Sequence, residues 1–132
     1  MESKRGMSDQ EIEQLVDRWI AYWDADPPDY EGAEADYLCD MLMPACECDP
    51  EVLWCFVRNA YKRNISERHL GLLAAGPLED LIAYHGPEYI DRIEIEARQN
   101  PSFRHLLGGV WRNIADAEVW KRVETLRDKD IW

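Results

Sequence analysis

The sequence contains no lysine or arginine between Trp19 and Val57, although 15 of its 132 residues are basic. This segment is nevertheless rich in acids and carries most of the net charge of −12. Such a field repels nucleic acids and anionic membranes and attracts basic protein surfaces. We therefore expect no nucleic-acid or membrane partner. The acidic residues are Asp24, Asp26, Asp29, Glu31, Glu34, Asp36, Asp40, Glu47, Asp49 and Glu51.

Long apolar segments are also missing. No run of about 18 apolar residues is present, so no segment is expected to span a membrane. The first residues lack the apolar stretch of a signal peptide, and we expect a cytoplasmic protein. No stretch alternates apolar and polar residues for long enough to indicate a strand. The 46% hydrophobic content still predicts a packed core, which must then be helical.

Capping signals and apolar periodicity predict the first helices. Ser8 and Glu11 match a capping box, and the apolar residues that follow at helical spacing predict a helix over about 9–24. A second helix is expected over about 31–43, with Pro44 ending it.

The rest of the chain also carries signals for the starts and ends of helices. Glycines after the last apolar residue predict helix ends at Gly76 and Gly86, and Pro77 and Pro87 then open the next helices. The two Gly-Pro pairs are therefore interpreted as junctions between helices. The helix before the last is expected to point Trp111 inward. The other predicted starts are Asp49-Pro50, Ser66, Asn100-Pro101 and Asp116.

These signals predict an all-α fold. We expect a compact bundle of about seven or eight short helices with helical-hairpin or solenoid-like packing. The length suits a single domain over residues 1–132. Within it, 8–48 would supply an N-terminal helix and the acidic segment, and 49–128 would form a helical scaffold.

Glu79, Asp80 and His85 are candidates for acid–base chemistry because they lie close together in the sequence. On one helix, however, the two acids point about 100° apart, and His85 falls on the apolar face. After Pro77, both acids would occupy a first helical turn, where the helix dipole favours anions. We interpret all three as structural, with an acid–base pair or a binding corner as the alternatives.

The four cysteines are candidate metal ligands. Cys39, Cys46, Cys48 and Cys55 have the spacing C-x6-C-x-C-x6-C, whereas structural zinc sites usually pair ligands two to four residues apart. We expect buried, reduced cysteines, with Cys48 exposed, and neither metal nor cofactor. Metal binding and a redox pair are the alternatives.

The segment from Ala75 to Trp111 carries a longer motif. It contains AGPLEDL, then HG, an alanine, P-x-F and finally LGGVW. In this pattern the chain resembles an uncharacterised bacterial family known only as a domain of unknown function. The resemblance covers residues from about 49 to 127 and implies a compact helical domain. It implies no activity, cofactor or catalytic residue, and the acidic segment lies almost wholly outside it.

No catalytic interpretation outweighs a structural one, so we expect a non-enzymatic protein–protein interaction protein. Its acidic surface would bind a basic protein partner, for example a nuclease-like toxin neutralised by an immunity protein or antitoxin. The residues expected to bind are Asp24, Asp26, Asp29, Glu31, Glu34, Asp36 and Asp40. Two alternatives remain: a metal-dependent or hydrolytic enzyme that uses the cysteines or the Glu79, Asp80 and His85 cluster, and a structural subunit of a bacterial complex.

Overall fold

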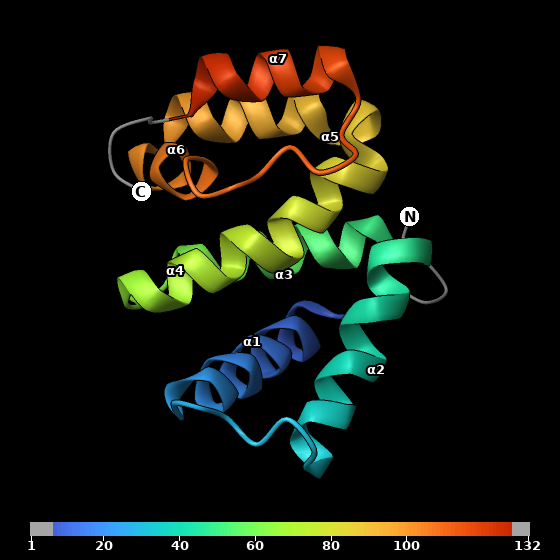
Figure 1. Cartoon of the computed structure of the whole chain (residues 1–132), viewed down its shortest axis with the longest axis vertical. Helices are drawn as coiled ribbons and strands as arrows, with labels where there is room; N and C mark the ends of the chain where they lie inside the picture. Colours follow the sequence, from blue (N-terminus) through green and yellow to red (C-terminus); the bar gives the residue numbers. More distant parts are fainter. Residues whose placement is uncertain (1–6, 128–132) are drawn as a thin grey trace. The chain divides into compact units, whose positions relative to one another are not determined.

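The computed structural model describes residues 7–127 (Figure 1). Helices are its regular elements, and no strand occurs in that range, which confirms the all-α fold. None of the helices within this range is long and apolar enough to cross a membrane. The chain divides into two compact units, Met1–Ala60 and Tyr61–Trp132. The expectation of one domain over the whole chain stays a prediction.

The first unit contains α1 (Asp9–Asp24), α2 (Ala33–Cys48) and all but the last residue of α3 (Pro50–Tyr61). The capping box at the start of α1 is confirmed, because Ser8 Oγ accepts from the Glu11 N–H at 3.1 Å and Glu11 Oε1 accepts from the Ser8 N–H at 2.8 Å. The rings of Trp19 and Phe56 meet edge to face, 5.7 Å between centroids, and join α1 to α3. The fully buried residues around them are Leu15, Val16, Leu53, Val57 and Ala60.

The helix α2 does not end at Pro44 as predicted. It continues to Cys48, where the backbone N–H of Asp49 still bonds to the Ala45 carbonyl at 3.2 Å. An interior proline removes one intrahelical hydrogen bond and bends a helix, but packing can hold the next turn in place. The prediction that Pro44 ends this helix is therefore wrong.

The second unit contains one long helical run in place of the predicted short helices. The run consists of α4 (Glu67–Leu73), a π-helical turn η1 (Ala74–Leu78) and α5 (Glu79–Gln99). Ser66 caps α4 as predicted, but Gly76 does not stop it and Pro77 does not open a new helix. A glycine stop requires a left-handed backbone, and no described glycine has a positive φ.

Both Gly-Pro pairs lie inside this run. A side chain on the residue before proline clashes with the proline ring in the helical conformation, so glycine lets the helix continue into proline. At Gly86-Pro87 the run kinks, because His85 leaves the helical region with φ −135° and ψ 20°. Gly86 and Pro87 thus mark a bend within α5, whereas the sequence predicted one helix ending and another beginning.

Gly86 has a second role in packing. A Cβ atom added there would lie 2.8 Å from Cγ1 of Val119, which belongs to α7 (Ala117–Leu126). The helices α5 and α7 lie side by side (Figure 1). Next to this contact, Arg122 of α7 donates to Asp91 at 2.9 Å and to Glu94 at 2.6 Å on α5. The hydrogen bond from Arg122 is the largest cause that lowers the pKa of the Glu94 carboxyl, and a hydrogen bond from Arg98 lowers it further.

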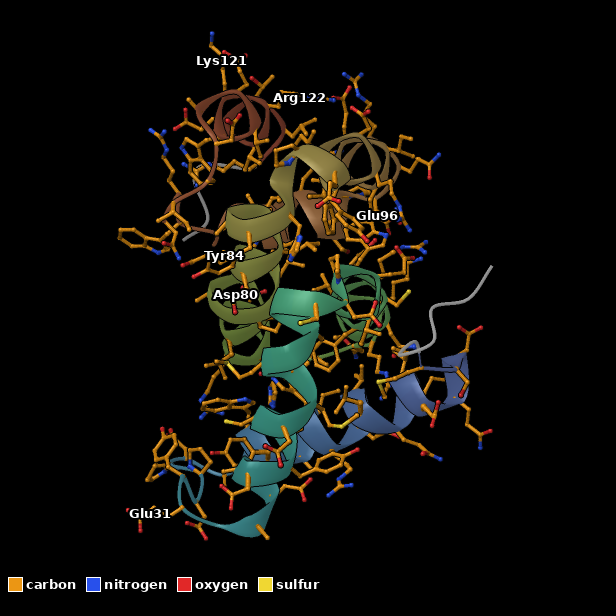
Figure 2. The ribbon with its side chains drawn as sticks, turned by 90° about the vertical axis from the view of Figure 1, so that its right-hand side faces the viewer. Glu31, Asp80, Tyr84, Glu96, Lys121 and Arg122 are labelled. Carbon is orange, nitrogen blue, oxygen red and sulfur yellow. The ribbon has the colours of Figure 1, made fainter. Side chains whose placement is uncertain are left out.

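A buried carboxylate secures the other end of α5. Glu96, labelled in Figure 2, accepts a short hydrogen bond from the Tyr61 hydroxyl. Lys62 Nζ lies 3.7 Å from the same carboxylate oxygen. The Tyr61 ring also contacts Phe103 of α6 (Pro101–Leu107) at 5.2 Å between centroids. This carboxylate therefore has the partners that a buried acid needs.

The segment after α6 differs from the prediction. The helix ends at Leu107, so Val110 and Trp111 lie in the loop that leads to α7. Val110 is buried, but Trp111 is 75% exposed and Ile114 is 63% exposed. The predicted start of α7 is correct, since the Asp116 carboxylate accepts from the N–H groups of Glu118 and Val119.

Gly86→Ala is expected to lower the free energy of unfolding by about 1–3 kcal/mol more than Gly76→Ala does. Both substitutions place a Cβ before a proline, but only the one at Gly86 meets another helix, whereas nothing lies within 4 Å of a Cβ at Gly76. Urea unfolding measures the difference, and Val119→Ala should reduce it. Equal losses in the two variants would contradict this account of the contact.

Candidate functional site

An apolar pocket lies between α1 and α2 of the first unit. Its volume is ≈ 320 Å³, and we call it the aromatic groove. The buried side chains of Trp19, Ala35 and Leu38 form its base, whereas Tyr30 and Met43 are 63% and 59% exposed at its rim. The other lining residues are Tyr22, Trp23, Cys39 and Leu42.

Aromatic edge-to-face contacts shape one wall of the groove. Tyr22 and Trp23 are consecutive on α1, with ring centroids 5.0 Å apart and planes at 86°. Tyr30, in the loop before α2, continues the cluster at 6.3 Å from Trp23. Burial is the largest cause that raises the pKa of the Tyr22 hydroxyl, which favours its neutral form. The cluster presents a rigid apolar surface.

One ion pair ties the two helices of the groove together. Arg18 of α1 donates to both carboxylate oxygens of Glu34 on α2, at 2.8 and 2.7 Å. Its guanidinium carbon lies 3.5 Å from the centroid of the Tyr37 ring, a cation–π contact. The hydrogen bonds from Arg18 lower the pKa of Glu34. Glu34 is therefore engaged within the unit, although the sequence placed it among the partner-binding acids.

Asp29 also has an internal role. Its carboxylate accepts the N–H of Glu31 at 3.1 Å and its carbonyl accepts that of Gly32 at 3.3 Å, which shapes the turn before α2. A Cβ on Gly32 would lie 2.5 Å from the Asp29 carboxylate, so a larger residue there would displace this side chain from its hydrogen bond to Glu31. Asp24, the last residue of α1, and Asp26, in the segment that follows, are both exposed.

Three of the predicted acids point to solvent without an ion pair to another residue in the range 7–127. Asp36 and Asp40 are exposed on α2, and Glu31 projects from the loop before it (Figure 2). Asp36 precedes Cys39 by three residues, and Asp40 precedes Met43 by three, so both acids flank the groove-lining stripe of α2. The structure thus combines exposed carboxylates with an apolar groove.

Two of the cysteines are less buried than predicted. Cys39 is exposed and Cys55 is half-buried, whereas Cys48 is exposed as predicted. None of these three forms a disulfide, and the side chain of Cys46 lies outside the described residues. Cys39 faces the aromatic groove, and the Cys55 thiol approaches Glu51 at 3.7 Å. Within the described part of the chain, no group of three His, Cys, Asp or Glu side chains is arranged to hold a metal ion.

Glu79, Asp80 and His85 have separate environments in α5. The Glu79 carboxylate accepts from the Trp111 N–H at 3.4 Å and from Asn113 Nδ2 at 3.1 Å, so it anchors the loop before α7. His85 Nδ1 lies 3.3 Å from Glu88 Oε1 at the kink. Burial, followed by repulsion from Glu79, raises the pKa of Asp80. Glu79 and Asp80 lie in the first turn of α5 as predicted, but the Glu79 N–H already bonds to the Ala74 carbonyl because the helical run continues through η1.

A protein-family model matches residues 26–131, and its description is a family of unknown function, DUF6869. The chain belongs to this family. The match begins at residue 26, so the DUF6869 domain includes most of the acidic segment, which the sequence resemblance had placed outside it. No curated protein and no solved structure matches the chain.

Sequence reasoning missed the aromatic groove in the DUF6869 chain. Neither Trp23 nor Tyr30 was singled out from the sequence, yet both line an open surface. A signal for it was present, since Trp19, Tyr22 and Trp23 follow one another at helical spacing on α1. Trp19 is buried and contacts Phe56 of α3, whereas Tyr22 and Trp23 stay partly exposed.

Asp80→Asn is expected to raise the stability of the DUF6869 chain at neutral pH. A carboxyl whose pKa is raised binds its proton more tightly in the folded state, so its stabilising contribution is present at low pH and is lost as pH rises through that pKa. Asparagine carries no charge at neutral or at acidic pH. Thermal unfolding from neutral to acidic pH should show a gain that shrinks on acidification, and a gain independent of pH would contradict this.

Proposed function

We propose that this chain is a non-enzymatic protein–protein interaction protein whose first unit binds a basic, amphipathic segment of a partner protein. One observation carries the proposal: an aromatic groove of ≈ 320 Å³ is flanked by exposed carboxylates. Apolar anchors in a pocket with a polar rim are typical of binding surfaces.

The negative charge around the groove favours a positively charged partner. No lysine or arginine occurs between Trp19 and Val57, and Arg18, the cation next to this stretch, is paired with Glu34. Asp36, Asp40 and Glu31 therefore contribute negative charge that no described cation neutralises by pairing. A field of this kind steers a basic partner and repels a second copy of the same acidic surface.

The shape of the groove selects an amphipathic segment. Its lining is mostly aromatic and aliphatic, with Tyr30 and Met43 exposed at the rim. A helix that inserts two or three apolar side chains would keep its lysines and arginines near the flanking acids. Methionine adapts to apolar surfaces of different shape. The proposed occupant is therefore a helix with one apolar and one basic face.

The more specific form of this proposal is an immunity protein or antitoxin. A nuclease-like toxin must present lysines and arginines to bind phosphates, and carboxylates can occupy the same positions. The acidic groove would then block the nucleic-acid site of the toxin. This form is supported by charge complementarity and is separable from the general one, which requires only a basic amphipathic partner.

Removing charge beside the groove is expected to weaken binding of a basic amphipathic peptide. The probe is a synthetic helical peptide of leucine and lysine, measured by titration calorimetry. The double variant Asp36→Asn with Asp40→Asn should bind the peptide about fivefold more weakly, because each exposed charge contributes a few tenths of a kcal/mol to binding. The wild-type affinity should fall as salt rises past about 0.15 M, and the variant should depend less on salt.

The matched control removes the same charge elsewhere. Glu13→Gln with Glu118→Gln changes the net charge equally but touches no residue of the groove. Equal weakening in both double variants would mean that only net charge matters and would contradict a localised site. A peptide with glutamate in place of lysine should not bind, and its binding would also contradict the proposal.

Removing the apolar anchors is expected to lower the affinity for the same peptide about tenfold, which corresponds to about 1.4 kcal/mol of binding free energy. Tyr30→Ala and Met43→Ala together test this, and both side chains are exposed, so the fold should persist. Unchanged affinity with an intact helical circular dichroism spectrum would show that the groove is not the binding site. Full loss of salt dependence is not expected here, because the acids remain.

A further inference from the structure

The second unit contains a larger pocket of different chemistry. Its volume is ≈ 600 Å³, and it lies between α4, the start of the long helical run, and the loop and helix that follow α6. Small-molecule sites commonly have volumes of about 300–1,000 Å³. The residues that line it are Gly71, Ala75, Gly108, Gly109, Val110, Trp111, Arg112, Trp120 and Arg127.

Small residues and two indole rings shape this pocket. Gly71, Gly108 and Ala75 leave room because they have little or no side chain. Trp120 of α7 is buried, whereas Trp111 is 75% exposed at the mouth. Flat rings beside an open volume favour a flat ligand, since stacked or edge-on aromatic contacts add to area burial. The pocket therefore suits a planar aromatic body.

Arg127 supplies fixed positive charge to the pocket. Its Nη1 donates to the Val110 carbonyl at 3.0 Å, and its guanidinium carbon lies 5.0 Å from the Trp120 ring centroid. Its Nη2 lies 3.8 Å from Glu124. Its Nε is buried and has no hydrogen-bond partner among residues 7–127. The side chain as a whole is 22% exposed, so its outer nitrogens are the ones that a ligand oxygen can reach.

Arg112 supplies a second charge at the mouth. It lies in a tight turn in which Asn113 has φ 53° and Ala115 N–H bonds to the Arg112 carbonyl at 2.9 Å. Its Nε approaches the Ala115 carbonyl at 3.4 Å, and its terminal nitrogens have no partner in the described part of the chain. The Glu79 carboxylate holds the same loop through the Trp111 N–H. The loop thus presents a guanidinium beside an indole.

The lining contains no aspartate or glutamate, although the chain has 27 acids against 15 bases. We infer that this pocket binds a small planar aromatic anion, stacked on the tryptophans and paired through a carboxylate or phosphate group with Arg112 and Arg127. Arginine matches both groups with paired hydrogen bonds. The inference is independent of the proposed function, because it concerns the other unit and a ligand of opposite charge.

A fluorescent aromatic anion tests this inference on the full chain. The probe is anilinonaphthalene sulfonate, with the uncharged phenylnaphthylamine as its neutral analogue. The sulfonate should bind, and Arg112→Gln should weaken it about tenfold, as expected for the loss of a hydrogen bond to a charged group. The neutral analogue should lose little affinity in this variant. The acids around the aromatic groove would repel the sulfonate from the first unit.

Two further variants locate the probe. Ala75→Phe fills the pocket from an exposed position and should abolish binding of both dyes. Lys121→Gln is the matched control, since Lys121 is exposed on α7, points away from the second unit and does not line the pocket (Figure 2). It should leave affinity unchanged. Circular dichroism and the midpoint of thermal unfolding verify that each variant folds.

Competition distinguishes the two candidate head groups. Displacement of the dye by naphthoate supports a carboxylate ligand, and displacement by adenosine monophosphate supports a phosphate ligand. Either result supports the inference. It is overturned if the sulfonate does not bind, if neither competitor displaces it, or if Arg112→Gln and Lys121→Gln affect it equally.

Discussion

The guanidinium of Arg18 is the positive charge that offsets repulsion between the two acidic helices of the first unit. It bridges α1 and α2 through both oxygens of Glu34 and lies against the Tyr37 ring. Basic residues are then absent as far as Arg58, so this pair joins the two helices beside a surplus of repelling carboxylates. Exposed ion pairs usually contribute little to stability. An arginine that binds both carboxylate oxygens and stacks on an aromatic ring has the geometry in which such a pair contributes the most.

Local signals predicted the starts of helices well. Ser8, Ser66, Asn100-Pro101 and Asp116 all precede helices in the structure, because caps and first-turn prolines act through groups within a few residues. The ends were predicted poorly. Pro44, Gly76 and Gly86 lie within continuous helical runs, since the packing around a helix decides whether an interior proline bends it or breaks it.

The candidate site could be predicted only in part. The excess of acids is a property of the sequence, and Asp36 and Asp40 are exposed as a binding role requires. That Glu34 is held by Arg18, and that Glu79 anchors the Trp111 loop, depends on residues 16 and 32 positions away, which no local pattern reveals. Trp111 was placed in a helix because its spacing fits one, but α6 ends at Leu107 and leaves it exposed.

The closeness of Gly86 and Val119 also constrains how members of this family can diverge. Any side chain at the position of Gly86 requires a smaller neighbour on α7 or a wider separation of the two helices. A wider separation would lengthen the 2.9 and 2.6 Å hydrogen bonds from Arg122 to α5. Homologous sequences should therefore change at these two positions together, and a glycine at the first should accompany a branched residue at the second.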